Sequence, residues 1–171
     1  MIKSWQAALK NSHKVRNHFF PELVTEHIKN KIELNHSNAL KKQFFVSVDE
    51  VLVTGGLKDP IGDEKYSPVP GLIHRYKNRA LFIPTQTCPV HCRYCFRKNE
   101  LNHQSDFLKN DFTQVCHYLI AHPEINEIIF TGGDPLMLSD QKIDYYLNEF
   151  SKIKSLKFIR FHTRTPIVMP L

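Results

Sequence analysis

Apolar positions recur with a helical period in the first quarter of the chain. One set, near the N-terminus, consists of Trp5, Ala8 and Leu9. A second set follows Pro21 within residues 22–33 and consists of Leu23, Val24, Ile28 and Ile32. Because residues three or four apart share one face of a helix, both sets predict amphipathic helices. We therefore expect a polar, helical region over residues 1–45.

Residues 50–73 lack such a period and are rich in turn-forming residues. The clusters are Gly55-Gly56, residues 59–63 (DPIGD) and residues 67–71 (SPVPG). We predict a connecting segment here.

Three short apolar runs follow, each with the length of a buried strand. They cover residues 80–83, 127–131 and 157–162. Two helical patterns separate them. The first covers residues 110–121, with an apolar face made of Phe112, Val115, Cys116, Leu119 and Ile120. The second begins after the capping residue Ser139, with an inward face made of Ile143, Tyr146, Leu147 and Phe150.

This alternation of strands and helices predicts an α/β fold with right-handed parallel crossovers. Residues that follow the strands then meet at the rim of a parallel barrel, where ligands bind. Three strands do not close a barrel, so we expect an incomplete one. The predicted division is a helical N-terminal region with its connecting segment, residues 1–73, followed by the barrel part, residues 74–171.

Composition narrows the class of protein. The chain has 171 residues, of which 42% are apolar and 23% charged, as is typical of a globular domain. Its 23 basic and 17 acidic residues give a net charge of +6, but the basic residues are spread along the chain, which disfavours a nucleic-acid surface. No apolar run has the length of a membrane span, and Met1 is not followed by a secretory apolar core. We expect a cytoplasmic protein that binds neither nucleic acid nor membrane.

The run CPVHCRYC contains the most informative chemistry. Cys88, Cys92 and Cys95 are separated by three and two residues. Three thiolates on one short loop can hold three corners of a cubane [4Fe–4S] cluster and leave the fourth iron open to a chelating molecule. Ordinary ferredoxins close the cluster with four cysteines.

Two alternative roles for the three cysteines remain open. A zinc site requires a fourth Cys or His at ligand spacing, and no second such pair follows, although His91 lies within the loop. A disulfide with one spare thiol requires an oxidising compartment.

Further polar residues follow the predicted strands. Gly132–Asp134 closes the second strand, where glycines let the backbone approach a ligand and the carboxylate attracts an ammonium group; the alternative is an ordinary turn. Arg97 lies two residues after the last cysteine and suits a substrate carboxylate. Arg164, after the third strand, also suits a carboxylate at the rim.

Several charged or sulfur-containing residues suit simpler roles. Arg75 and Arg79, four residues apart, suit a helical turn that presents two guanidinium groups to a phosphate, or else a solvated basic face. Arg93 and Lys98 are expected to be structural or solvent-exposed charges. Cys116 is expected to be a core thiol, and we assign His162 no role.

These segments together resemble the radical S-adenosylmethionine (radical SAM) superfamily, and more closely the lysine 2,3-aminomutase family. The closer resemblance is carried by residues 74–79 (HRYKNR), 92–97 (CRYCFR), 130–137 (FTGGDPLM) and 164–168 (RTPIV). Residues 69–74 (VPGLIH) and the short N-terminal region are most similar to the branch that serves β-lysylation of elongation factor P.

The resemblance implies an incomplete parallel (β/α) radical SAM barrel with three cofactors: a [4Fe–4S] cluster, S-adenosylmethionine and pyridoxal 5′-phosphate. It implies that Cys88, Cys92 and Cys95 ligate the cluster, and that the amine and carboxylate of S-adenosylmethionine chelate its open iron. Gly132–Asp134 would adjoin the methionyl end of that molecule.

For the remaining cofactor and the substrate, the resemblance implies that Arg75 and Arg79 grip the phosphate of pyridoxal phosphate. Arg97 would bind the carboxylate of lysine, and Arg164 would be a further cofactor contact. The implied activity is an isomerase that converts L-α-lysine to β-lysine, with an electron donor as partner.

In that family, the lysine that binds pyridoxal phosphate covalently lies C-terminal to these motifs, as do the acidic residues that bind the ε-ammonium group of the substrate. No residue here corresponds to them, so the catalytic lysine is not assigned. We expect this chain to be a fragment, or to be completed by a second chain, and to be inactive in amino migration by itself. A catabolic lysine 2,3-aminomutase and a non-catalytic iron–sulfur or zinc-binding module are the alternatives, and the sequence does not indicate an oligomeric state.

Overall fold

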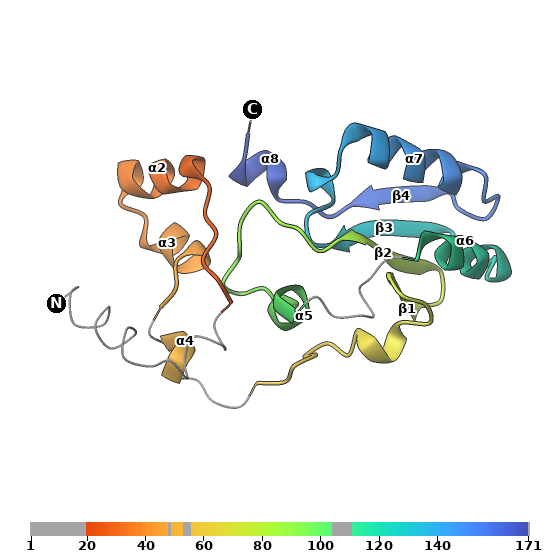
Figure 1. Cartoon of the computed structure of the whole chain (residues 1–171), viewed down its shortest axis with the longest axis horizontal. Helices are drawn as coiled ribbons and strands as arrows, with labels where there is room; N and C mark the ends of the chain where they lie inside the picture. Colours follow the sequence, from red (N-terminus) through yellow and green to blue (C-terminus); the bar gives the residue numbers. More distant parts are fainter. Residues whose placement is uncertain (1–19, 48, 53–55, 104–110, 171) are drawn as a thin grey trace.

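The computed structural model describes residues 20–47, 49–52, 56–103 and 111–170 (Figure 1). The predicted helix around Trp5 and Leu9 lies outside the described residues, as does Asn110, the predicted start of a later helix.

A four-stranded sheet forms the centre of the larger part of the molecule. Its strands are β1 (Leu72–Tyr76), β2 (Arg79–Thr85), β3 (Glu127–Gly132) and β4 (Phe158–Phe161), and they lie side by side in that order. β1 pairs with β2 antiparallel, whereas β2, β3 and β4 are parallel neighbours. The predicted α/β fold with three parallel strands is therefore confirmed.

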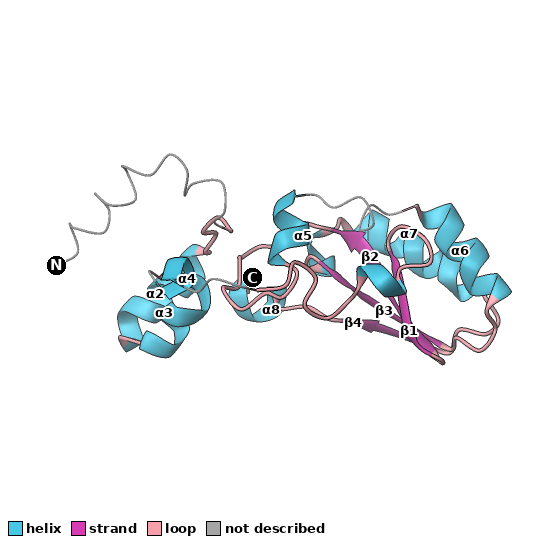
Figure 2. Ribbon diagram, turned by 90° about the horizontal axis from the view of Figure 1, so that it is seen from below, coloured by secondary structure: helices cyan, strands magenta, loops and turns pink. Residues whose placement is uncertain are grey.

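Two helices cover one face of this sheet (Figure 2). α6 (Phe112–Ala121) begins after Asp111, whose carboxylate accepts a hydrogen bond from the Gln114 amide. α7 (Asp140–Ser151) begins after the predicted cap Ser139, whose hydroxyl accepts from the Lys142 amide. Each cap satisfies one of the free amides at the start of its helix.

The core lies between these helices and the sheet. Phe82 of β2 is fully buried there, and three other buried rings meet it edge to face. They are Phe130, Tyr146 and Phe150, with ring centroids 5.2, 5.0 and 5.2 Å from that of Phe82. Such edge-to-face pairs add stability beyond the buried area. Ile73 and Ile83 form a smaller buried cluster on the opposite face of the sheet, and Tyr66 packs against it.

Several sequence predictions about local structure were wrong. Residues 72–76 were expected to end a connecting segment and begin a helical turn, but they form β1, so Arg75 and Arg79 lie on the two strands of a hairpin. The predicted boundary after residue 73 therefore falls inside a strand. Ile120 was expected on the inward face of its helix, but 64% of its surface is exposed.

From residue 20 on, the described N-terminal part contains three helices, α2 (Glu26–Asn35), α3 (Asn38–Phe44) and α4 (Asp49–Leu52). α2 begins later than predicted because the Thr25 hydroxyl caps it, which leaves Leu23 outside the helix and 42% exposed. Ile28 and Phe44 from these helices form a second, smaller core with Val90 and Val168. The helical region is thereby joined to the segment that follows β2.

Four short elements complete the described chain: the 3₁₀ turns η2 (Glu64–Tyr66) and η4 (Pro135–Met137), and the helices α5 (Lys98–His103) and α8 (Thr165–Val168). Among the described residues, no helix combines the length and the apolar character that crossing a membrane requires.

Candidate functional site

The three predicted cluster cysteines lie on the loop between β2 and α5 and line one cavity of about 630 Å³. The same cavity is lined by Gly132–Asp134 at the end of β3 and by Arg164 after β4. Because β2, β3 and β4 are parallel, their carboxyl ends meet at one edge of the sheet, and the segments that follow them converge there. The sequence separates these residues by up to 76 positions, and the fold brings them to one place.

The two glycines bring the end of β3 against the cysteine loop. Gly132 has φ +99°, a conformation that other residues rarely adopt, and a Cβ on Gly133 would lie 2.4 Å from the Thr87 carbonyl oxygen. The Gly133 amide donates to the Thr85 carbonyl over 2.9 Å, and the Asp134 amide donates to the Thr87 carbonyl over 2.8 Å. Glycine is thus favoured at Gly132 by its positive φ and at Gly133 by close contact with the backbone, and the predicted approach of both residues to a ligand stays a prediction.

The carboxylate of Asp134 is 6% exposed and accepts four hydrogen bonds from the chain. One oxygen accepts from the Leu136 amide at 3.1 Å and the Thr163 hydroxyl at 2.6 Å. The other accepts from the amides of Arg164 and Thr165, at 2.7 and 3.0 Å. Asp134 therefore fixes the segment after β4 to the end of β3, and its predicted contact with an ammonium group stays a prediction.

All four cysteines are free thiols. Burial raises the pKa of Cys88 to about 12, with the neighbouring charges of Cys95 and Asp134 adding to this effect, and burial also raises the pKa of Cys95. Three thiolates at this place would repel one another, so their ionisation requires a strongly positive partner. The iron atoms of a cluster supply such a charge.

The three cysteine thiols are the type of ligand that an iron–sulfur cluster takes. Within the described residues, no three His, Cys, Asp or Glu side chains converge closely enough to hold one ion. In a cubane cluster each thiolate binds a different iron, so its ligands lie farther apart than those of a single zinc ion. The fourth cysteine, Cys116, packs half-buried against the main core on α6, as predicted.

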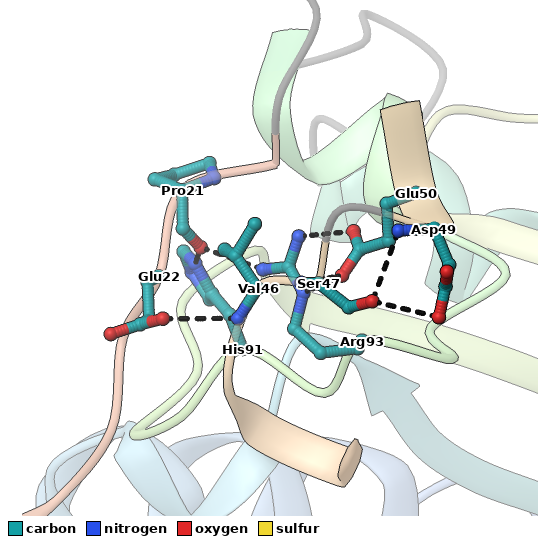
Figure 3. A network of polar contacts seen from close by, with 8 residues as sticks. All are labelled: Pro21, Glu22, Val46, Ser47, Asp49, Glu50, His91 and Arg93. Atoms are coloured by element: carbon teal, nitrogen blue, oxygen red, sulfur yellow. Dashed lines mark hydrogen bonds and ion pairs between the residues drawn. The ribbon is translucent and has the colours of Figure 1, made fainter. Parts of the chain in front are cut away.

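The cysteine loop is held by the N-terminal region (Figure 3). The Pro21 carbonyl oxygen accepts from His91 Nδ1 at 2.7 Å and from Arg93 Nη1 at 3.2 Å. Arg93 is 7% exposed, and its guanidinium also binds both carboxylate oxygens of Glu50, at 2.9 and 2.6 Å. Arg93 is thus a structural charge, as predicted, and the Nδ1 side of His91 is engaged with the backbone.

A second cavity of about 320 Å³ adjoins the first and brings Arg75, Arg79 and Arg97 together. The Arg97 guanidinium is buried and lies 2.7 Å from the Asp63 carboxylate, which is buried as well. Sequence reasoning placed Asp63 in a turn only and missed this pair. Asp63 lies in a turn 34 positions before Arg97, and no local sequence pattern indicates that the two residues form a pair.

Arg164 contacts one of the three predicted cluster cysteines directly. Its Nη1 donates to Cys92 Sγ at 3.1 Å and to the Tyr94 hydroxyl, and its Nη2 donates to Gln43 Oε1 at 3.3 Å. The guanidinium also lies over the Phe44 ring, 5.1 Å from its centroid. Sequence reasoning missed Gln43, Phe44 and Tyr94 as part of the site, because two of them belong to a helix that precedes the barrel.

Comparison with known protein families gives one match, which covers the strands and loops of the site. The sequence profile described as "Radical SAM superfamily" matches residues 82–169. The chain belongs to the radical SAM superfamily. The matched region contains the three cysteines, Gly132–Asp134 and Arg164, so the family membership rests on the segments that converge at the cavity. The resemblance to this superfamily is confirmed.

Curated relatives are similar over much of this chain. A protein of Escherichia coli (strain K12) named L-lysine 2,3-aminomutase is 41% identical over 137 residues, which are 80% of this chain and 40% of the relative. Proteins of the same name from Methanococcus maripaludis and Bacillus subtilis (strain 168) are 32% and 39% identical, over 88% and 67% of this chain and over 36% and 24% of the relatives. The chain thus spans less than half of the length of the curated relatives it matches.

Proposed function

We propose that this chain forms the part of a lysine 2,3-aminomutase that holds a [4Fe–4S] cluster and S-adenosylmethionine. The observation that carries this proposal is the convergence of Cys88, Cys92 and Cys95 with Gly132–Asp134 on one cavity. The names of the similar curated proteins supply the reaction, the isomerisation of L-α-lysine to β-lysine. Residues 69–74 point to the branch that serves elongation factor P, and the free thiols suit a reducing cytoplasm.

In this proposal each group of residues has one task. The three cysteines bind three irons and leave the fourth accessible from the cavity. The cluster, when reduced by an electron donor, and S-adenosylmethionine together supply the carbon radical that begins the reaction. Gly132–Asp134 forms a rigid wall beside the methionyl group, because its backbone is tied to Thr85 and Thr87. This wall fixes the position of the bound molecule.

The second cavity is proposed for pyridoxal phosphate and lysine. Arg75 and Arg79 lie on adjacent strands of a hairpin and line this cavity. Two guanidinium groups there suit the phosphate dianion. Arg97 lines both cavities. We propose that its cation, which pairs with Asp63, binds the lysine carboxylate and orients the substrate without taking part in proton transfer.

The cluster part of the proposal is tested by anaerobic reconstitution of the chain with iron and sulfide. We expect about four irons and four sulfides per chain, and an electron paramagnetic resonance signal of the reduced cluster that changes when S-adenosylmethionine binds. Serine substitution of Cys88, Cys92 or Cys95 removes the cluster, whereas the matched control Cys116→Ser keeps it. Bound zinc in place of iron, or equal loss of iron in the control, would overturn the assignment.

The reaction is tested in a chimera in which this chain replaces the corresponding segment of the Escherichia coli relative. We expect the chimera to form β-lysine from L-lysine, as measured by mass spectrometry, and its Cys95→Ser variant to form none. A chimera that cleaves S-adenosylmethionine but never converts lysine would contradict the substrate assignment and leave the cluster assignment standing.

A further inference from the structure

Arg164 differs from two other arginines near the cysteine loop, Arg93 and Arg97, in that no described carboxylate pairs with its guanidinium group. Arg93 and Arg97 are both buried, and each forms an ion pair, with Glu50 and Asp63 respectively. Among the residues that the structure describes, no carboxylate forms an ion pair with the Arg164 guanidinium. Its positive charge is therefore not neutralised locally, and its Nη1 donates to Cys92 Sγ at 3.1 Å.

The position of this guanidinium is fixed from several sides. Gln43 Oε1 accepts from Nη2 at 3.3 Å, and the rings of Phe44 and Tyr94 lie 5.1 and 5.6 Å from the guanidinium carbon. The Arg164 main-chain amide donates to the Asp134 carboxylate at 2.7 Å. These contacts hold the cation beside the sulfur, so the arrangement is built into the fold.

We propose that Arg164 tunes the reduction potential of the cluster through Cys92. This inference rests on the proposed function, since it concerns the cluster that the function requires. Reduction adds one electron to the cluster, [4Fe–4S]²⁺ + e⁻ → [4Fe–4S]⁺, with no bond made or broken in the protein. The electron comes from the donor protein, or from dithionite in a titration.

The direction of the effect follows from electrostatics. The added electron makes the cluster more negative, and a nearby cation stabilises the reduced form more than the oxidised form. Hydrogen bonds to the cysteine sulfurs act in the same sense, and both are established determinants of cluster potential. Arg164 therefore makes the cluster easier to reduce, and a larger fraction of it is ready to react at a given donor potential.

The test is a redox titration of the reconstituted chain without S-adenosylmethionine, followed by electron paramagnetic resonance. We expect Arg164→Gln to lower the equilibrium constant for reduction about tenfold, which for one electron is a fall of about 59 mV in midpoint potential. Arg164→Lys keeps the charge and is expected to stay within about threefold of wild type. The matched control Lys157→Gln removes one positive charge from an exposed site before β4 and is expected to change nothing.

A second variant releases the cation without removing it. Gln43→Ala deletes the acceptor that holds Nη2, while the Gln43 main-chain carbonyl still accepts from the Arg93 amide at 2.8 Å. We expect about a threefold fall in the same equilibrium constant, and this variant decides the question if Arg164→Gln does not retain iron.

The outcomes separate this inference from the proposed function. If the wild-type chain binds no iron, both the proposed function and this inference are wrong. A cluster that is present, with the same potential in wild type, Arg164→Gln and Gln43→Ala, overturns the role of Arg164 alone.

Discussion

Replacement of Gly133 by alanine tests whether close backbone contact fixes the site. A Cβ at this position would lie 2.4 Å from the Thr87 carbonyl oxygen and 2.7 Å from both the Gln86 carbonyl carbon and the Thr87 nitrogen. All three atoms belong to the backbone, so no side chain can rotate to make room. The end of β3 and the cysteine loop must therefore separate.

The cost can be worked out from what this separation disrupts. Insertion of a methyl group into a closely packed place costs roughly 1–3 kcal/mol. The hydrogen bonds from the Gly133 and Asp134 amides to Thr85 and Thr87 would lengthen or break, at about 0.5–1.5 kcal/mol each. We expect a total loss of about 2–6 kcal/mol in the free energy of unfolding, a large part of the total stability of a domain.

The assay is urea unfolding followed by circular dichroism, with Gly56→Ala as the matched control. A Cβ at Gly56 meets no atom within 4 Å, so the free energy of unfolding of this variant is expected to stay within about 1 kcal/mol of the wild-type value. It can rise slightly, because alanine lowers the conformational entropy of the unfolded chain. If Gly133→Ala unfolds within about 0.5 kcal/mol of wild type, the close contact does not constrain the site and the reasoning fails.

Two further variants test the charges that support the site. Asp63→Asn leaves the buried Arg97 cation without its counterion. We therefore expect a loss of about 3–5 kcal/mol in the free energy of unfolding, measured by urea titration. A loss under about 1 kcal/mol would show that the pair is dispensable. Burial raises the pKa of Glu50, but the hydrogen bonds and charge of Arg93 outweigh burial and hold that pKa below its ordinary value of 4.5. The ionised Glu50 therefore stabilises the fold at neutral pH, and this stabilisation is lost as the pH falls below about 4.5 through the lowered pKa. The difference in unfolding free energy between wild type and Glu50→Gln, measured from pH 7 to pH 3, should shrink in that range, and a difference that is independent of pH would contradict this.

The parallel part of the fold was predictable because its signals are local. Each of β2, β3 and β4 contains a short apolar run, and the cap Ser139 and the inward residues of α7 follow a helical pattern. The convergence of the polar residues that follow these strands was predictable for a related reason, since parallel topology brings the carboxyl ends of neighbouring strands together.

What the sequence did not reveal depends on contacts between distant segments. β1 was missed because residues 67–71 contain two prolines and a glycine, which indicate turns, and because Arg75 and Arg79 have helical spacing that a two-residue hairpin turn also produces. The supports of the cysteine loop were missed because Glu50 lies 43 residues before Arg93. Neither member of such a pair carries a local signal of its partner.

The attachment of the cysteine loop to Pro21 and Glu50 has a consequence for biosynthesis (Figure 3). A polypeptide leaves the ribosome from its N-terminus, and early segments fold first. The groups that accept hydrogen bonds from His91 and Arg93 are therefore already made when the three thiols emerge, and the loop can dock before it receives the proposed cluster. The order of segments along the chain thus lets the proposed cluster loop dock as soon as it has been made.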